Sequence, residues 1–235
     1  MKILVVNPNS SVEMTQSIRE ALERIRRPDT VVEVVRLENG PSSIESATDG
    51  AMSTPLLLDR IRWANQEGFD AIIVACFSDP GLEPAREVSG ILVLGIQQTT
   101  LAIAATLGHK YSILTPLSSR IASKEQDVRR FRVDSACASV RALDLSVSQT
   151  EGDPELTKRR VKEVARAAIE QDGAEVIILG CAGMVGYAEE LERDMGIVVL
   201  DPTSVTFKVT EGLVELGIRH SKRGLFHTPP ERSQD

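Results

Sequence analysis

The stretch Ala174–Met184, AEVIILGCAGM, decides the fold of this chain. Within it, Val176–Leu179 is a continuous apolar run, mostly β-branched, which is typical of a parallel strand that is buried on both faces. The small residues of Gly180–Gly183 follow and would let a ligand approach the backbone closely. Cys181 therefore stands at the carboxyl end of a buried strand, where open α/β sheets hold their ligands.

The same pattern occurs earlier in the chain. Residues 67–76 read EGFDAIIVAC and residues 172–181 read DGAEVIILGC, so Cys76 and Cys181 occupy equivalent positions, 105 residues apart. A second pair of similar segments, KILVVNPNSS from Lys2 and KYSILTPLSS from Lys110, each reads as a strand followed by Pro-x-Ser-Ser. We therefore interpret the chain as two similar halves, each of which contributes one cysteine.

Strand and helix patterns alternate throughout the chain, which predicts the α/β class. The repeat predicts two pseudo-symmetric, doubly wound parallel-sheet domains with the active site in the cleft between them. We expect residues 1–96 and 206–235 to form the first domain and residues 97–205 to form the second. The carboxyl ends of the strands, and with them Cys76 and Cys181, would then face one cleft.

Local signals predict where individual elements begin and end. The polar segment Glu38–Gly50 is expected to be a mobile loop near the active site. The tail, residues 218–235, is expected to pack as an irregular strap and to fray at its end. The remaining expectations are a capping box of Ser10 with Glu13, helix starts at Thr54-Pro55, Asp79-Pro80, Asp153-Pro154 and Asp201-Pro202, and a strand over Val140–Val147.

Composition narrows the range of functions. The 235 residues carry a formal net charge of −7, which argues against nucleic acid or an anionic membrane as the partner. Apolar runs are no longer than strands, so no membrane span is expected, and the chain enters a strand at Lys2, so no signal peptide is expected. Three cysteines without CxxC or HExxH spacing predict neither a disulfide framework nor a metal site. We expect a cytoplasmic protein.

Two thiols that face one cleft suit proton transfer at a carbon acid, one removing a proton and the other returning one to the opposite face. Each cysteine precedes a short helix start, where backbone N–H groups are expected to lower the thiol pKa and to hold an enolate oxygen. A cysteine at a strand end can also be a simple packing residue, but packing does not require the same residue twice. Cys137 has no equivalent and is interpreted as structural, and His109, His220 and His227 as solvated or capping residues.

These motifs resemble the aspartate/glutamate/hydantoin racemase superfamily and, within it, the hydantoin and allantoin racemase branch. The resemblance covers nearly the whole chain, and the two cysteine motifs together are its most specific part. The segments that carry it are Ile3–Ser11, Cys76–Leu82 (CFSDPGL), Leu179–Met184 (LGCAGM), Leu200–Pro202 and Ser221–Leu225.

The resemblance implies racemisation of 5-substituted hydantoins or allantoin without any cofactor or metal, with Cys76 and Cys181 as the two bases. It further implies a small-molecule substrate and a homo-oligomer. The residues implied to bind the substrate are Asn9, Ser10, Phe77, Ser78, Gln97, Thr115, Pro116, Ala182, Gly183 and Met184.

The chain departs from the branch at two places in the site wall. Ser78 replaces a common glycine, and Gln97-Gln98 replaces a segment that commonly holds an acidic residue, so the ring substituent stays open. The enantiomer that each cysteine serves also stays open.

Other functions compete with the hydantoin racemase interpretation. Maleate isomerase, aspartate/glutamate racemase and arylmalonate decarboxylase are the alternatives within the superfamily. Two retained thiols disfavour the decarboxylase, and the uncharged neighbours of both cysteines disfavour free amino acids as substrates. A non-catalytic small-molecule binding module is a more remote alternative, for which the thiols would be unnecessary.

Overall fold

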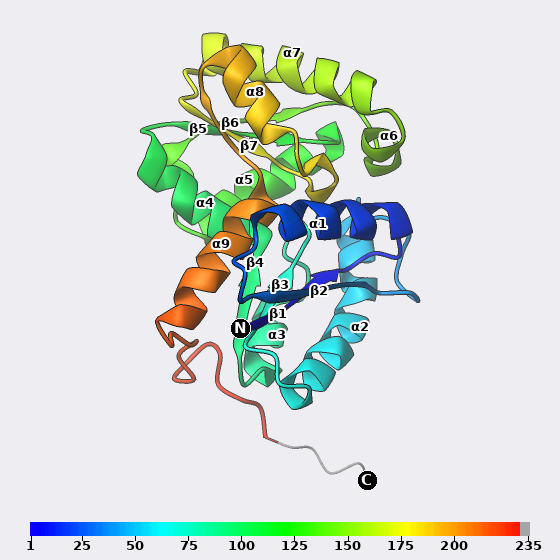
Figure 1. The fold of residues 1–235 in the computed structure, drawn as a ribbon. Coiled ribbons are helices and arrows are strands. Elements are labelled where there is room, and N and C mark those ends of the chain that lie inside the picture. The colour runs from blue at the N-terminus through cyan, green and yellow to red at the C-terminus, as the bar shows by residue number, and fades with distance from the viewer. Residues whose placement is uncertain (231–235) are drawn as a thin grey trace.

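The computed structural model describes residues 1–230 and contains two four-stranded parallel sheets (Figure 1). The strand order is β2-β1-β3-β4 in the first sheet and β6-β5-β7-β8 in the second, so equivalent strands of the two halves take the same places. The expected α/β class and the duplicated sheet are both confirmed. The strands are β1 (Lys2–Asn7), β2 (Val31–Arg36), β3 (Ala71–Val74), β4 (Leu92–Gly95), β5 (Tyr111–Thr115), β6 (Cys137–Ala142), β7 (Val176–Leu179) and β8 (Val198–Leu200).

Helices connect successive strands and cover the sheets (Figure 1). The α-helices are α1 (Val12–Ile25), α2 (Ala47–Gln66), α3 (Leu82–Val88), α4 (Ile96–Leu107), α5 (Ile121–Arg130), α6 (Val147–Gly152), α7 (Pro154–Asp172), α8 (Ala188–Met195) and α9 (Pro202–Glu215). Short 3₁₀ turns are η1 (Ser118–Arg120), η2 (Asp134–Ala136) and η3 (Ala182–Met184).

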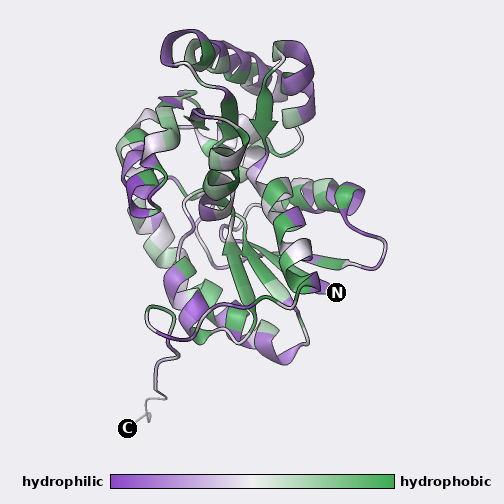
Figure 2. Ribbon diagram, turned by 90° about the vertical axis from the view of Figure 1, so that its left-hand side faces the viewer, coloured by the Kyte–Doolittle hydropathy of each residue, from purple (hydrophilic) through white to green (hydrophobic). Residues whose placement is uncertain are grey.

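Both faces of the first sheet are packed, because successive side chains of β1 point in opposite directions. Ile3 and Val5 belong to the same core cluster as the apolar face of α1, whereas Leu4 and Val6 pack with α2. The two cysteine-bearing strands, β3 and β7, are buried along their whole length, as their apolar runs predict. Figure 2 shows the strands as apolar ribbons between helices whose outer surfaces are more hydrophilic.

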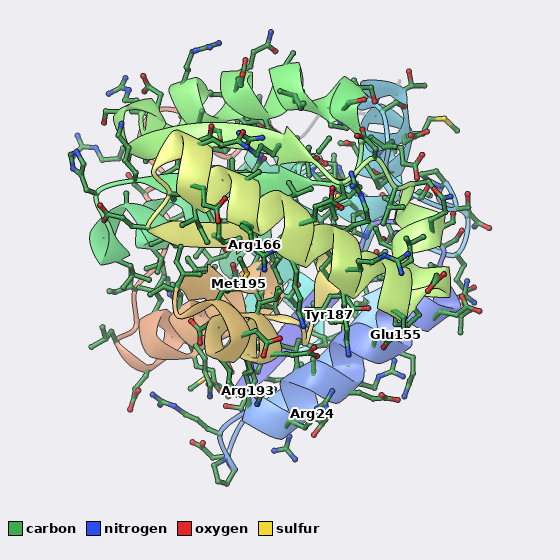
Figure 3. The ribbon with its side chains drawn as sticks, turned by 90° about the horizontal axis from the view of Figure 1, so that it is seen from above. Arg24, Glu155, Arg166, Tyr187, Arg193 and Met195 are labelled. Carbon is green, nitrogen blue, oxygen red and sulfur yellow. The ribbon has the colours of Figure 1, made fainter. Side chains whose placement is uncertain are left out.

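The two sheets share a continuous core. One hydrophobic cluster includes Ile73 and Phe77 from the first half and Ile178 from the second. Viewed from above, α7 and α8 lie over the second sheet, and α8, which carries Arg193, lies beside α1, which carries Arg24 (Figure 3).

The chain returns to the first sheet at its end. Helix α9 starts where expected, because the Asp201 carboxylate accepts hydrogen bonds from the backbone N–H of Thr203 at 2.9 Å and from the hydroxyl of Ser204 at 2.8 Å. The helix packs on α4 and on β3 and β4. We retain residues 1–96 with 206–235, and residues 97–205, as the proposed domains.

The tail covers the outer edge of the first sheet, as expected of a strap. The ring of His220 hydrogen-bonds the backbone of Val93 in the edge strand β4, and the ammonium of Lys222 donates to the carbonyl of Arg86 at 2.6 Å. An edge strand that is covered in this way does not present its unpaired backbone N–H and C=O groups to a strand of another chain. The last five residues, 231–235, lie outside the described part of the tail.

Two predicted helix starts were wrong. Helix α1 is capped by Ser11, whose hydroxyl accepts from the backbone N–H of Met14 at 3.0 Å, while the hydroxyl of Ser10 donates to a loop carbonyl instead. Helix α2 begins at Ala47, because Ser46 and its third following residue form a reciprocal capping box, so Pro55 lies inside the helix. Part of the expected loop over Glu38–Gly50 is therefore helical.

Two further local predictions were also wrong. Strand β6 ends at Ala142, because Ser146 forms a capping box that starts α6. Helix α3 is preceded by Gly81, which provides no side-chain cap, so Asp79 does not cap it. The carboxylate of Asp79 binds the N-terminus of α4 instead.

Candidate active site

Both repeated cysteines line one cavity between the two sheets. Cys76 follows β3 and Cys181 follows β7, so each thiol stands at the carboxyl end of its strand. The cavity contains about 520 Å³ of empty space, including open solvent at its mouth. The cysteines form no disulfide. Two thiols that are 105 residues apart in the sequence are thus brought to one site by the duplicated fold.

Six of the residues expected to contact a substrate line this cavity, namely Asn9, Phe77, Ser78, Thr115, Pro116 and Ala182. Four others do not line it. Ser10 is turned to the carbonyl of Pro41, and Met184 is fully buried in the core. Gly183 contacts the Cys181 sulfur through its backbone N–H, and Gln97 is buried with its amide N–H bonded to Asp127 at 2.9 Å.

The Cys76 thiol is not acidified as expected. Burial raises its pKa, and hydrogen bonds from the hydroxyl and backbone N–H of Ser78, together with the charge of Lys124, oppose that rise. The sulfur and the Ser78 hydroxyl lie 3.2 Å apart. The expectation failed because α3 starts only at Leu82 and contributes no N-terminus to this thiol.

The Cys181 thiol lies at the start of a helical turn, as expected. Its side chain is 8% exposed and caps η3, where the sulfur accepts from the backbone N–H of Gly183 at 3.4 Å. Both thiols thus receive an N–H group from the residue two positions along the chain, Ser78 in one half and Gly183 in the other. The local geometry of the two motifs is therefore repeated together with the sequence.

Asp79 joins the Cys76 loop to α4. Its two carboxylate oxygens accept from the backbone N–H groups of Gln97 at 3.0 Å and Gln98 at 2.8 Å, which are orphan donors of the helix N-terminus. Gly95 occupies the N-cap position, where an added Cβ would lie 2.3 Å from the Asp79 carboxyl carbon. Burial raises the pKa of Asp79 to about 6 although both amides lower it. This loop is consequently fixed to the next helix.

Sequence analysis missed a buried lysine in the cavity wall. Lys124 on α5 is 3% exposed, and its ammonium donates to the carbonyl of Phe77, the residue that follows Cys76. Burial lowers the pKa of Lys124, which Asp127 and Cys76 oppose. A signal existed, because Lys124 lies four residues before the buried Val128 on the inner face of α5.

Two further charged residues were missed at the cavity. Arg120 at the start of α5 and Glu45 in the loop before α2 both line it. Glu45 accepts from the backbone N–H of Val147 at 2.8 Å, which links the first half to α6 of the second. Within residues 1–230, the Arg120 guanidinium makes neither a hydrogen bond nor an ion pair. The cavity therefore offers a charged donor and a charged acceptor to a ligand.

Asn9 presents mainly a donor to the cavity. Its amide oxygen accepts from Asn7 at 2.7 Å and from the backbone N–H of Ser11 at 2.9 Å, whereas its amide nitrogen contacts only the sulfur of Met14, at 3.4 Å. A ring carbonyl would complete this donor better than a sulfur acceptor does. Thr115 adds a hydroxyl at the end of β5.

Cys137, interpreted as structural, and the three histidines interpreted as solvated or capping lie outside the cavity lining. Cys137 opens β6, and burial raises its pKa to about 11. Neither His109, His220 nor His227 lines the cavity. No group of His, Cys, Asp and Glu suited to a metal ion occurs within residues 1–230. In the same part of the chain, every helix is too short or too polar to cross a membrane.

The chain matches the model of the family "Asp/Glu/Hydantoin racemase" over residues 3–210. It is 35% identical to a hydantoin racemase from Pseudomonas sp. (strain NS671), over 99% of this chain and 93% of the relative. It is 36% identical to a hydantoin racemase from Rhizobium meliloti, over 97% of this chain and 95% of the relative.

A solved allantoin racemase from Klebsiella pneumoniae superposes with a TM-score of 0.96 at 33% identity, covering 100% of this chain and 96% of the other. An arylmalonate decarboxylase mutant superposes with a TM-score of 0.70 at 16% identity over 92% of this chain and 94% of the other, which supports the shared fold alone. The fold and the site thus define an isomerase of the racemase type. The chain belongs to the Asp/Glu/hydantoin racemase family.

Proposed function

We propose that this protein racemises 5-substituted hydantoins or allantoin without a cofactor, using Cys76 and Cys181 as a pair of bases. The observation that carries the proposal is that both thiols, from equivalent strand ends, line one cavity without forming a disulfide. The relatives named hydantoin racemase and the structural neighbour named allantoin racemase support the ring as the substrate class.

One turnover moves two protons in opposite senses. The thiolate of one cysteine removes the proton from ring carbon 5, next to the carbonyl, and the electron pair of the C–H bond passes to the enolate. The thiol of the other cysteine returns a proton to the opposite face of the same carbon. The product has inverted configuration, and the two cysteines have exchanged their protonation states. Reaction from the other enantiomer restores them.

The cavity wall favours a neutral planar ring. Phe77 and Ala182 supply uncharged contact surface beside the two cysteines, and Asn9 supplies a donor for a ring carbonyl. A free amino acid would have to bury both an ammonium and a carboxylate here, which costs free energy unless each group finds a partner. These contacts support a cyclic amide over aspartate or glutamate.

Arg120 and Glu45 favour a polar ring substituent. An alkyl or aromatic group would displace water from both charged side chains without replacing the lost hydrogen bonds. The ureido group of allantoin carries a carbonyl acceptor for Arg120 and N–H donors for Glu45. Within the ring class, we therefore favour ureido-bearing rings over hydantoins with hydrocarbon substituents.

The test follows the α-proton of each pure enantiomer in D₂O, with the Cys76→Ser and Cys181→Ser variants. Either substitution removes one base, since a serine hydroxyl is too weakly acidic, so racemisation should fall by several orders of magnitude, on the order of 10³ or more. Each variant should still exchange the enantiomer whose hydrogen faces the remaining thiol, with opposite preferences. The matched control is Cys137→Ser, which should retain full racemisation. Equal loss of exchange with both enantiomers in both folded variants would refute the pair of bases.

The same samples separate the competing functions. A covalent adduct at one cysteine, seen by mass spectrometry, would support a maleate isomerase instead, and loss of carbon dioxide from an arylmalonate would support a decarboxylase. Exchange of aspartate or glutamate as fast as that of a hydantoin would support an amino acid racemase. A protein that binds the ring without exchanging its proton would be a binding module. A cytoplasmic location and a homo-oligomer remain predictions.

A further inference from the structure

Lys124 places a buried positive charge beside the Cys76 loop. Its ammonium donates to the carbonyl of Phe77 and lies 5.4 Å from the centre of the Phe77 ring. The side chain is 3% exposed and lines the cavity. A buried ammonium is costly unless other groups compensate its charge. Such a side chain at this place calls for a functional explanation.

The carboxylate of Asp127 pairs with this ammonium, but only at long range. Asp127 lies 3.9 Å from the Lys124 ammonium, beyond hydrogen-bond distance. The same carboxylate accepts from the side-chain amide of Gln97 at 2.9 Å and pairs with Arg130 at 3.6 Å. Asp127 thus helps to keep Lys124 charged, while the hydrogen bond of the ammonium goes to the Cys76 loop.

We propose that Lys124 is a positioning residue that fixes the backbone after Cys76 and supplies the positive charge that stabilises the Cys76 thiolate. The ammonium neither gains nor loses a proton during the reaction. Cys76 becomes a thiolate when it gives its proton to the substrate carbon in one direction, and that thiolate accepts the proton of the substrate carbon in the other direction. This inference rests on the proposed function, in which Cys76 is one of the two bases.

The electrostatics of the two groups are reciprocal. Lys124 lowers the pKa of Cys76 against the dominant effect of burial, and Cys76 raises the pKa of Lys124 against the same effect. Asp79, in the loop after Cys76, acts oppositely on the thiol and favours the ammonium. Arg120, which ends η1 and precedes α5, disfavours the Lys124 charge, and Glu45 faces the cavity from the first half.

The test titrates Cys76 directly, in a full-length protein that carries Cys137→Ser and Cys181→Ser. The rate of alkylation by iodoacetamide, measured between about pH 6 and pH 10.5, reports the thiolate fraction. Lys124→Met should raise the pKa of Cys76 by about one unit or more, so the alkylation rate at about pH 8 falls about tenfold. Lys124→Arg keeps the charge and should recover part of the rate.

The matched control is Lys110→Met. Lys110 lies in the same half and also donates to a backbone carbonyl, that of Ser135 at 2.8 Å, but it lies outside the cavity lining. The Lys110→Met substitution should leave the pKa of Cys76 unchanged. An unchanged pKa of Cys76 in a folded Lys124→Met protein would overturn the proposal.

A second variant decides the matter if Lys124→Met does not fold, as judged by circular dichroism. Lys124→Gln keeps an N–H donor for the Phe77 carbonyl but removes the charge, so the pKa of Cys76 should still rise. An unchanged value there would also overturn the proposal. Alkylation needs no substrate, so its outcome is distinct from that of the exchange experiment, which tests the racemase function itself.

Discussion

The substitution Asp79→Asn measures the free-energy cost of burying an ionised carboxylate at the N-terminus of α4. Asp79 is 4% exposed and has a backbone φ of 44°, a conformation that aspartate tolerates better than most residues. It holds two backbone N–H groups of the helix, which favours its charge, yet burial raises its pKa to about 6 from the ordinary 3.8. The native protein therefore takes up a proton at this group more readily than the unfolded chain does.

The size and sign of the effect follow from that difference. A shift of about two pKa units corresponds to about 3 kcal/mol, at 1.36 kcal/mol per unit. Because the native pKa lies above the unfolded one, the stabilisation is complete below about pH 4 and is lost as the pH rises through about 6. Asparagine never ionises, but its amide nitrogen cannot accept the second of the two backbone N–H groups. The Asp79→Asn protein should therefore be less stable than the parent near pH 4, by about 1 kcal/mol or more for the lost hydrogen bond, and should gain up to about 3 kcal/mol relative to the parent between pH 4 and pH 8.

Urea unfolding of both proteins from about pH 4 to pH 8 measures the difference in the free energy of unfolding. The matched control is Asp153→Asn, since Asp153 caps α7 through the backbone N–H of Leu156 at 2.9 Å but is exposed to solvent. Its variant should show no gain above pH 7. If the free energies of the Asp79→Asn protein and the parent differ by the same amount at pH 4 and at pH 8, the carboxylate is not buried at a cost and the reasoning is wrong.

Three further predictions use the same kind of comparison. Gly95→Ala should lower the free energy of unfolding by about 2 kcal/mol or more, because its Cβ would meet the Asp79 carboxyl carbon at 2.3 Å, whereas Gly90→Ala, with its nearest atom at 4.0 Å, should be tolerated in the same urea titration. Burial lowers the pKa of His220 to about 4, so stability present above about pH 6.5 should be lost as the pH falls, and His220→Gln should flatten that loss in urea titrations over the same range. Arg120→Met should raise the KM for allantoin about tenfold while leaving that for a hydantoin with a methyl substituent nearly unchanged, and a similar rise for both would contradict a substituent contact.

The repeat was enough to predict the fold, because each half carries the same strand signals in the same order. Helix starts were predicted correctly where a single side chain caps the adjacent turn, as Asp153 and Asp201 do. They failed where two candidates stand side by side, as Ser10 and Ser11 do, and where a cap comes from far along the chain. Asp79 caps a helix whose first bonded amide is 18 residues away, and no local pattern reports that bond.

The site was predicted less completely than the fold. Sequence reasoning correctly expected both cysteines at one cavity, because each follows a buried strand at an equivalent position of the two halves. It missed Lys124, Arg120 and Glu45, because each reaches the cavity from an element whose position depends on tertiary packing. Gln97 was expected at the substrate, but its side-chain amide donates to Asp127 on α5 instead.

The charges around Cys76 cannot make the enzyme favour one enantiomer at equilibrium. Mirror-image substrates have equal free energy in water, so their equilibrium constant is one and kcat/KM must be equal in both directions at every pH. Lys124 and Asp79 can change which cysteine carries the proton in the resting enzyme. They can therefore change which enantiomer binds with its hydrogen facing a thiolate. Under the proposed two-base mechanism, the repeat supplies two equivalent thiols, and we expect the unrepeated charges of α5 and the Cys76 loop to set how kcat and KM are divided between the enantiomers.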